Sequence, residues 1–262
     1  MIEGMLCIDM HVHVFEPQQT SYGFYGQTME VLIDRMDHNS IDKALIFPFA
    51  SGLTHEDFKK FNDYIIKSIN KYPSRLIGSC LATPLHGKFC LDEVERCANL
   101  GIRGVKFLSH AHGNYFVDGE IMNPIMEKIN ELKMIVTIHS DFDQKRCNPY
   151  QVVRLGQRFP EVTILMAHMG MNSDSTTIIP DLIKDTKNVI IDTADTPNLP
   201  YEVFVKPMEI VPDQIVFGSD LPALSPEVEL KKIEIAEEFY GLTKEQKRKI
   251  LGENAERILG LV

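Results

Sequence analysis

Histidine and aspartate residues end several apolar segments of this chain, where they could bind a divalent metal. The first segment, residues 8–13, reads Ile-Asp-Met-His-Val-His. Side chains alternate between the two faces of a strand, so His11 and His13 would point to the same side and Val12 away from it. Imidazole is the commonest protein ligand for zinc and similar ions. Because a His-x-His pair also arises by chance, the prediction of a metal site depends on further ligands.

Three further polar residues end apolar segments that are distant in the sequence. They are His139, His168 and Asp220. In a parallel barrel the carboxyl ends of all strands meet at one rim, so these side chains would lie close together there. A buried polar group without a partner costs roughly 2 to 7 kcal/mol, and a charge costs more. A shared metal ion is therefore favoured over separate, hydrogen-bonded strand ends.

The elements that must position these residues alternate between strand and helix along the chain. After the strand at residues 8–13, we expect strands at 43–48, 75–83, 102–108, 134–139, 162–168, 189–192 and 214–220. We expect helices at 27–38, 54–71, 91–100, 121–132, 149–159, 176–184, 202–210 and 225–240, and two short ones from 243 and from 254. The strands are near-continuous apolar runs, as when both faces are buried.

This alternation predicts a (β/α)8 TIM barrel, an α/β fold, as a single domain over residues 1–262. A doubly wound open sheet is the alternative, but it usually has a glycine-rich phosphate turn after an early strand, and this sequence has none. Three expected helix starts carry capping signals: Thr54 with Asp57, Asn148 before Pro149, and Thr243 with Gln246.

The composition indicates a protein that acts on small molecules. The chain has 262 residues, 44% of them hydrophobic, and a net charge of −10, which argues against nucleic acid or an anionic membrane as its main partner. No signal peptide or membrane-spanning stretch is evident, and the 5 cysteines form no Cys-x-x-Cys pair. We expect a cytoplasmic protein with free thiols. The oligomeric state, including a homo-oligomer, stays open.

Taken together, the motifs resemble the amidohydrolase superfamily. They are His11-Val12-His13, His139, the Ala-His-Met-Gly segment at 167–170, the Gly-Ser-Asp segment at 218–220 and the closing segment 252–259. The resemblance is greater to the amidohydrolase-related (amidohydrolase 2) branch of TIM-barrel metal-dependent hydrolases, which also includes aminocarboxymuconate-semialdehyde decarboxylase.

The resemblance implies one divalent metal ion bound by His11, His13, His139 and Asp220. Zinc would be the usual ion, with Mn²⁺ or another transition metal as alternatives. His168 would then lie beside the metal-bound water as a catalytic residue that orients or deprotonates it, and Asp220 could share this role. A divalent ion can lower the pKa of bound water to roughly 7.

Lys106 leaves a second arrangement open. It ends the fourth strand, where two-metal members of the superfamily carry a carboxylated lysine between the ions. If Lys106 were carboxylated, His139 and His168 would bind a second metal. We prefer one metal, because the branch commonly has a lysine in a similar Gly-x-Lys segment and uses one ion. An unmodified Lys106 could bind a substrate carboxylate or phosphate, or could pack its stem and extend its head to solvent.

The loop after Lys106 carries a second His-x-His pair. His110 and His112 lie in the segment Ser-His-Ala-His-Gly at 109–113, and we expect them to contact substrate rather than metal. His86 is a weaker candidate. Arg146 could hold an anionic group, although a solvated loop arginine is the simpler interpretation.

Three functions are compatible with these residues. They are a metal-dependent hydrolase of an amide, ester or lactone, a metal-dependent non-oxidative decarboxylase (a lyase), and a non-catalytic barrel that keeps a metal. A site at a rim lined by polar groups favours catalysis over a closed structural zinc site. Decarboxylases of the family tend to be longer and to aim an arginine at the carboxylate. This chain is compact and offers no obvious such arginine, so we expect a hydrolase.

Overall fold

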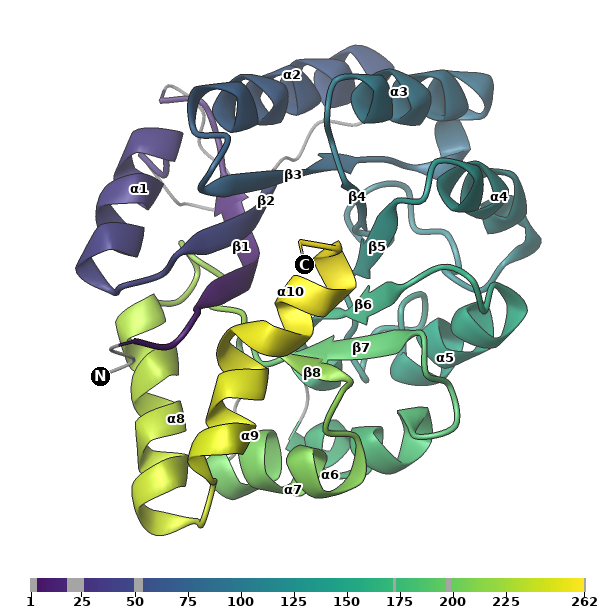
Figure 1. Ribbon diagram of the computed structural model, residues 1–262. Helices are drawn as coiled ribbons and strands as arrows, with labels where there is room; N and C mark the ends of the chain where they lie inside the picture. Colours follow the sequence, from purple (N-terminus) through teal and green to yellow (C-terminus); the bar gives the residue numbers. More distant parts are fainter. Residues whose placement is uncertain (1–3, 18–25, 50–53, 172, 197–198, 262) are drawn as a thin grey trace.

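Eight parallel strands follow one another in sequence order around a nearly closed barrel (Figure 1). The structure, a computed structural model, describes residues 4–17, 26–49, 54–171, 173–196 and 199–261. The strands are β1 (Ile8–Val14), β2 (Lys43–Pro48), β3 (Leu76–Leu81), β4 (Gly104–Phe107), β5 (Ile135–Ile138), β6 (Ile164–Met166), β7 (Val189–Asp192) and β8 (Ile215–Val216). The predicted (β/α)8 TIM barrel is confirmed.

Helices follow the strands, and most of them form the outer layer of the barrel (Figure 1). They are α1 (Met29–His38), α2 (His55–Lys71), α3 (Lys88–Asn99), α4 (Asn123–Glu131), α5 (Pro149–Arg158), α6 (Ser173–Ile183), α7 (Lys206–Ile210), α8 (Pro226–Phe239), α9 (Lys244–Arg248) and α10 (Asn254–Leu259). Short 3-10 or π segments are η1 (Pro84–His86), η2 (Glu120–Met122), η3 (Ala167–Gly170), η4 (Tyr201–Val205) and η5 (Lys249–Glu253).

Local capping signals place several helix starts. The Thr54 hydroxyl accepts a hydrogen bond from the Asp57 N–H, and the Asp57 carboxylate accepts one from the Thr54 N–H, so α2 begins with the predicted capping box. The side chain of Asn148 caps α5, and that of Thr243 caps α9. These three starts agree with the sequence because a cap depends on residues only three positions apart.

The last strand is shorter than predicted, and hydrogen bonds to β1 close the barrel beyond it. β8 covers Ile215–Val216 instead of residues 214–220. After it, the Asp220 N–H donates to the His11 carbonyl (2.9 Å) and the His13 N–H donates to the Leu221 carbonyl (2.8 Å). A Cβ atom on Gly218 would lie 2.9 Å from the His11 Cβ, so a larger residue there would push these segments apart.

The amino-terminal end of the barrel is closed by α10, which lies across it in Figure 1. Its residues Ala255 and Leu259 pack into one apolar cluster with barrel residues that include Ile8, Met10 and Val216. A Cβ atom on Gly252 would lie 2.4 Å from the Leu6 carbonyl oxygen, so this close approach requires glycine. A ligand must therefore enter the barrel from the carboxyl end of the strands.

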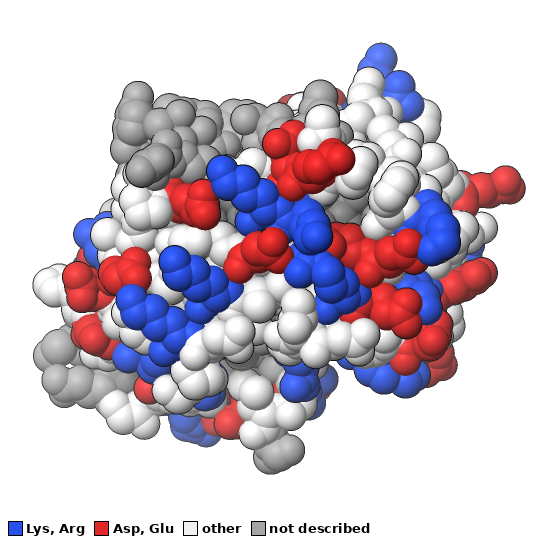
Figure 2. Space-filling view, turned by 90° about the horizontal axis from the view of Figure 1, so that it is seen from above, with Lys and Arg blue, Asp and Glu red and all other residues white. Residues whose placement is uncertain are grey.

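Charges of both signs are mixed on the surface. On the face shown in Figure 2, Lys and Arg side chains are interspersed with Asp and Glu. Ion pairs brace the helices: Arg96 to Asp63 (2.8 Å) joins α3 to α2, and Lys88 to Asp92 (2.6 Å) lies within α3. Among the residues described, no helix has both the length and the apolar character needed to cross a membrane.

Candidate metal centre and active site

Two histidines of β1 meet one carboxylate at the carboxyl end of the barrel. The Nε2 atoms of His11 and His13 both lie 3.3 Å from Oδ1 of Asp220. All three residues are buried. Strand alternation brings both imidazoles to one side, and the hydrogen bond from Asp220 N–H to β1 brings the carboxylate to them.

A hydrogen bond behind each histidine orients its ring toward this carboxylate. The Nδ1 atoms of three histidines lie against acceptors: His11 against Asp192 Oδ2 (2.7 Å), His13 against the Pro48 carbonyl (3.4 Å) and His168 against the Ala194 carbonyl (3.1 Å). A carbonyl or carboxylate oxygen accepts hydrogen bonds, so these partners assign the proton to Nδ1. The Nε2 lone pairs then point toward the interior of the site.

Asp192, at the end of β7, supports two of these histidines and was overlooked in the sequence. Its Oδ2 binds His11 Nδ1, and its Oδ1 accepts from the N–H groups of His168 (2.8 Å) and Ala194 (3.2 Å). The signal that could have revealed it is the one used for the others, since Val-Ile-Ile-Asp at 189–192 is an apolar run that ends in a carboxylate.

His168 stands on a turn rather than on a strand. β6 ends at Met166, and His168 and Met169 adopt left-handed backbone angles (φ 62° and 45°). Asp220 is also left-handed (φ 57°). Such angles cost of order 1 to 3 kcal/mol for a residue other than glycine, and they concentrate at functional sites. The bond from His168 N–H to Asp192 helps to hold this turn.

The donor set fits a divalent cation. One ligand atom from each of His11, His168 and Asp220 can be chosen so that all lie within 4.8 Å of one another. The His13 Nε2 lone pair faces the Asp220 oxygen at 3.3 Å, so two hydrogen-bond acceptors meet without a hydrogen between them. Only a cation or an added proton makes that contact favourable. Imidazole nitrogen and carboxylate oxygen are common donors to zinc and manganese, so these residues are candidate metal ligands.

The predicted ligand His139 lies nearby but in a different group. Its ring centroid is 5.0 Å from that of His168. With His110 and Cys147 it forms a group whose donor atoms all lie within 4.8 Å of one another. Ligation of the first ion by His139 stays a prediction.

Burial sets the charge states in the site. Burial lowers the pKa of His168 to about 4, and the electrostatic effect of His11 acts in the same direction. Burial also lowers the pKa of Lys106 to about 8. Burial also raises the pKa of Asp192 to about 6. For Asp220 burial acts in the same upward direction, but the close contacts with His13, His11 and His168 outweigh it and hold the pKa below its usual value. The Asp220 carboxyl is therefore ionised, and burial favours the neutral imidazoles around it.

The cluster opens into a cavity of about 200 Å³, which we call the barrel-end cavity. Its lining residues are His13, Phe49, Lys106, Leu108, His110, His139, His168, Met171, Asp195, Asp220 and Ala223. Lys106 is buried, its Nζ atom donates to His11 Nε2 (3.2 Å), and it lies 4.3 Å from the centre of the Phe47 ring.

The predicted substrate contacts separate in the structure. Lys106 and His110 line the barrel-end cavity, with His110 exposed at its mouth. His112 does not line it and packs edge-on against Phe58, with ring centroids 4.9 Å apart. The prediction that His112 contacts the substrate is untested, and the position of His112 outside the cavity does not support it. The Arg146 guanidinium lies over the Phe116 ring (4.2 Å).

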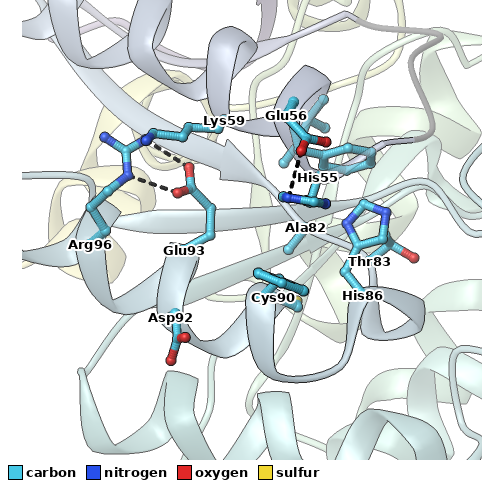
Figure 3. Close-up of a pocket in the computed structure, with 13 residues that line it drawn as sticks. His55, Glu56, Lys59, Ala82, Thr83, His86, Cys90, Asp92, Glu93 and Arg96 are labelled. Atoms are coloured by element: carbon cyan, nitrogen blue, oxygen red, sulfur yellow. Dashed lines mark hydrogen bonds and ion pairs between the residues drawn. The ribbon is translucent and has the colours of Figure 1, made fainter.

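A larger pocket of about 350 Å³, the outer pocket, lies between α2 and α3 (Figure 3). Several of its charged groups have partners: His55 Nε2 lies 2.8 Å from Glu56, and Arg96 binds Glu93 (2.7 Å). His55 stacks on Phe89 with ring centroids 4.4 Å apart.

The strand order and the polar cluster define the class of the protein, a (β/α)8 TIM barrel with candidate metal ligands at the carboxyl end of its strands. Its family follows from the sequence. The family model Amidohydro_2, described as amidohydrolase, matches residues 8–261, and the chain belongs to this family. No curated protein sequence matches the chain.

Solved structures share the fold at low sequence identity. The 5-carboxyvanillate decarboxylase of Sphingomonas paucimobilis has a TM-score of 0.74 and 18% identity, covering 98% of this chain and 99% of that one. The 2,6-dihydroxybenzoate decarboxylase of Rhizobium has a TM-score of 0.78 and 15% identity, covering 98% and 99%. The dihydroxybenzoic acid decarboxylase of Polaromonas sp. JS666, with bound manganese and 2-nitroresorcinol, has a TM-score of 0.78 and 16% identity, covering 98% and 97%.

These structures correct our expectation of a hydrolase. The three are decarboxylases, and this chain covers 97% to 99% of their length. The argument that decarboxylases of the family are longer therefore fails. The Polaromonas structure contains manganese, so the prediction of zinc has no specific support. The candidate ligands identify a site for a divalent metal without specifying which one.

Proposed function

We propose that this protein is a metal-dependent, non-oxidative decarboxylase of a small hydroxylated aromatic acid. The observation that carries the proposal is the position of Lys106. Its buried Nζ atom lies 3.2 Å from Nε2 of His11, inside the cavity that holds the candidate metal ligands. A carboxylate bound there would meet a cationic side chain next to the metal site.

The size and lining of the barrel-end cavity support a small aromatic substrate. About 200 Å³ suits a single ring with a few substituents, below the range of roughly 300 to 1,000 Å³ for drug-sized ligands. Phe49 and Leu108 supply apolar walls, whereas Lys106, His110 and Asp195 supply polar groups. The structural neighbours named above act, by their names, on hydroxylated aromatic acids.

In this proposal His11, His13, His139 and Asp220 would hold one divalent ion, with His168 beside it. When bound, the ion would act as a Lewis acid that anchors the substrate carboxylate and a neighbouring hydroxyl oxygen. Zinc and manganese both suit these donors. A carboxylated Lys106 with a second ion is the alternative arrangement.

The chain's own residues would position the acid and supply a proton. In decarboxylation the bond between the ring carbon and the carboxylate breaks, CO2 leaves, and the electron pair on the ring carbon takes up a proton. Because Asp220 is ionised and His168 is neutral before the reaction, one of them would first take up a proton from solvent and then deliver it to the ring carbon. Both line the cavity, and the bond from His168 Nδ1 to the Ala194 carbonyl leaves its Nε2 side facing the substrate.

The test is an assay of the Mn²⁺-loaded protein with 2,6-dihydroxybenzoate, 5-carboxyvanillate and a lactone panel in D2O. We expect CO2 release together with one deuterium on the ring carbon that carried the carboxylate. Lys106→Met should raise KM more than it lowers kcat, because it removes the cation that binds the carboxylate. Lys59→Met in the outer pocket is the matched control.

Hydrolysis of a lactone without CO2 release would contradict the proposal. So would CO2 release that continues unchanged after chelation and dialysis. Metal analysis by plasma mass spectrometry of the same samples distinguishes a site with one ion from a site with two.

A further inference from the structure

Asp195 lies in the loop after β7 and lines the barrel-end cavity. We propose that Asp195 is a specificity residue of this site. Its carboxylate accepts a hydrogen bond from a hydroxyl or amino group that the substrate ring carries opposite its own carboxylate, and it repels rings with a second carboxylate at that position. The inference rests on the proposed decarboxylase function and narrows the substrate to aromatic monocarboxylic acids with a hydrogen-bond donor on the far side of the ring.

The barrel-end cavity has side chains of opposite charge on two of its walls. Lys106 belongs to β4, and Asp195 follows β7, three strands further around the eight-stranded barrel. Both line the same cavity of about 200 Å³, which suits a single ring. A ring whose carboxylate lies at Lys106 therefore turns its opposite edge toward the wall that carries Asp195.

The backbone that carries Asp195 is fixed on both sides. Before it, the Ala194 N–H donates to Asp192 Oδ1 (3.2 Å). After it, the Lys232 ammonium on α8 donates to the Thr196 carbonyl (3.2 Å). Asp195 itself has a left-handed backbone (φ 50°), a conformation that is costly for a residue other than glycine and that is found mainly at functional sites. The neighbouring bonds thus hold a backbone from which the carboxylate extends.

The Asp195 carboxylate can accept a hydrogen bond from a ligand. Within the residues that the structure describes, no hydrogen bond or ion pair involves its side chain. The nearby ammonium of Lys232 is held by the Glu229 carboxylate, at 2.8 and 3.0 Å. A carboxylate has two acceptor oxygens, and a partly buried one gains from a donor. A hydroxyl or amino group of the substrate supplies that donor.

Negative charge on this wall determines which substituents it tolerates. Burial raises the pKa of Asp195, the charge of Asp220 acts in the same direction, and Lys232 opposes both. The repulsion between the carboxylates of Asp195 and Asp220 acts equally on a third carboxylate, so a second acid group on the substrate binds poorly here. A neutral donor avoids this repulsion.

The experiment measures binding without turnover, with three sulfonates as probes. A sulfonate has the negative charge of the substrate carboxylate but cannot release CO2. The probes are 2-hydroxybenzenesulfonate, 2,4-dihydroxybenzenesulfonate and 3-hydroxy-4-sulfobenzoate, which carry a hydrogen, a hydroxyl and a carboxylate opposite the sulfonate. Calorimetric titration of the Mn²⁺-loaded full chain should give the dihydroxy probe a Kd at least about tenfold below that of the monohydroxy probe, the low end for a hydrogen bond to a charged group. The carboxylate probe should bind more weakly than both.

Asp195→Gly is the test variant, because glycine adopts the left-handed backbone without strain and the fold is kept. It should bind the monohydroxy and dihydroxy probes alike and bind the carboxylate probe more tightly than wild type does, because the like charge is gone. Opposite changes for two probes distinguish specificity from a general loss of binding. The matched control is Asn114→Gly, since Asn114 is also left-handed (φ 61°) in a loop after a strand but does not line the cavity. It should keep the preferences of wild type.

Equal binding of the monohydroxy and dihydroxy probes by wild type would overturn the inference. A preference that Asp195→Gly retains, or a carboxylate probe that wild type binds as tightly as the dihydroxy probe, would also overturn it. None of these results affects the proposed decarboxylation, which is tested by CO2 release. If none of the three probes binds, both this inference and the proposed class of substrate are wrong.

Discussion

The barrel-end cavity and the outer pocket both contain histidines, but their surroundings differ. In the barrel-end cavity, His11 and His13 are buried and converge on one carboxylate oxygen of Asp220 at 3.3 Å. In the outer pocket, the side chain of His55 is 45% exposed and pairs with Glu56, whose side chain is 71% exposed. The outer pocket is also larger, at about 350 Å³ against about 200 Å³.

Neither the size of a cavity nor its histidine content identifies the functional site. A solvated ion pair contributes little and leaves no donor unsatisfied. In a buried imidazole whose Nδ1 donates to an acceptor, Nε2 carries a lone pair that needs a partner. In the barrel-end cavity, the Nε2 lone pairs of His11, His13 and His168 converge. The smaller cavity is therefore the candidate for chemistry.

The largest effect should come from Asp220→Asn. It removes both a candidate ligand and a candidate proton donor, so we expect kcat/KM to fall by about 10³-fold or more and Mn²⁺ to be lost on dialysis. Asp92→Asn, in the outer pocket, should keep activity within about twofold. Activity assays with metal analysis check both. Retention of activity by Asp220→Asn would remove the distinction between the two cavities.

His168→Asn should retain metal and lose about 100-fold in kcat, because the remaining ligands still bind the ion while proton transfer is impaired. The matched control is His86→Asn in the outer pocket, which should behave as wild type. If His168→Asn also lost its metal, His168 would be a ligand, as its position beside His11 and Asp220 allows.

Asp192→Asn should weaken Mn²⁺ binding by about 10- to 100-fold, the range for groups that support metal ligands. The reason is that Asp192 holds the Nδ1 of His11 and the backbone of His168. Equilibrium dialysis measures this, with Asp63→Asn beside Arg96 as control. An unchanged Kd would mean that the bond from Asp192 does not set the orientation of His11.

Mn²⁺ should stabilise the folded protein. At a concentration of about 100 times Kd, binding contributes about 2.7 kcal/mol, which corresponds to a rise in Tm of about 5 to 10 °C for a chain of this size. Differential scanning calorimetry should show this rise in wild type and in His55→Asn. It should be absent in His11→Asn, and a rise there would place the ion elsewhere.

The smallest effect should come from His55→Ala. Its pair with Glu56 is exposed, so we expect a change in Tm within about 2 °C and unchanged turnover. Turnover and calorimetry on one preparation check this. A large loss of activity would show that the outer pocket takes part in function.

Much of the fold could be predicted because its signals are local. Apolar runs alternating with helical segments and capping pairs such as Thr54 with Asp57 depend on neighbours in the sequence, and they placed the strands and several helix starts. The ends of β6 and β8 could not be predicted this way. Both depend on contacts with distant segments, the bond from His168 N–H to Asp192 and that from Asp220 N–H to His11.

The residue types that end the strands can be read from the sequence, and they predict that imidazoles and carboxylates meet at one rim of a TIM barrel. How these side chains pair is seen in the folded chain: Asp192 supports His11, His139 groups with His110 and Cys147, and His112 packs outside the cavity. Strand register and loop turns set hydrogen-bond directions and the distances between donor atoms to within an ångström. The order of residues along the chain does not specify such distances.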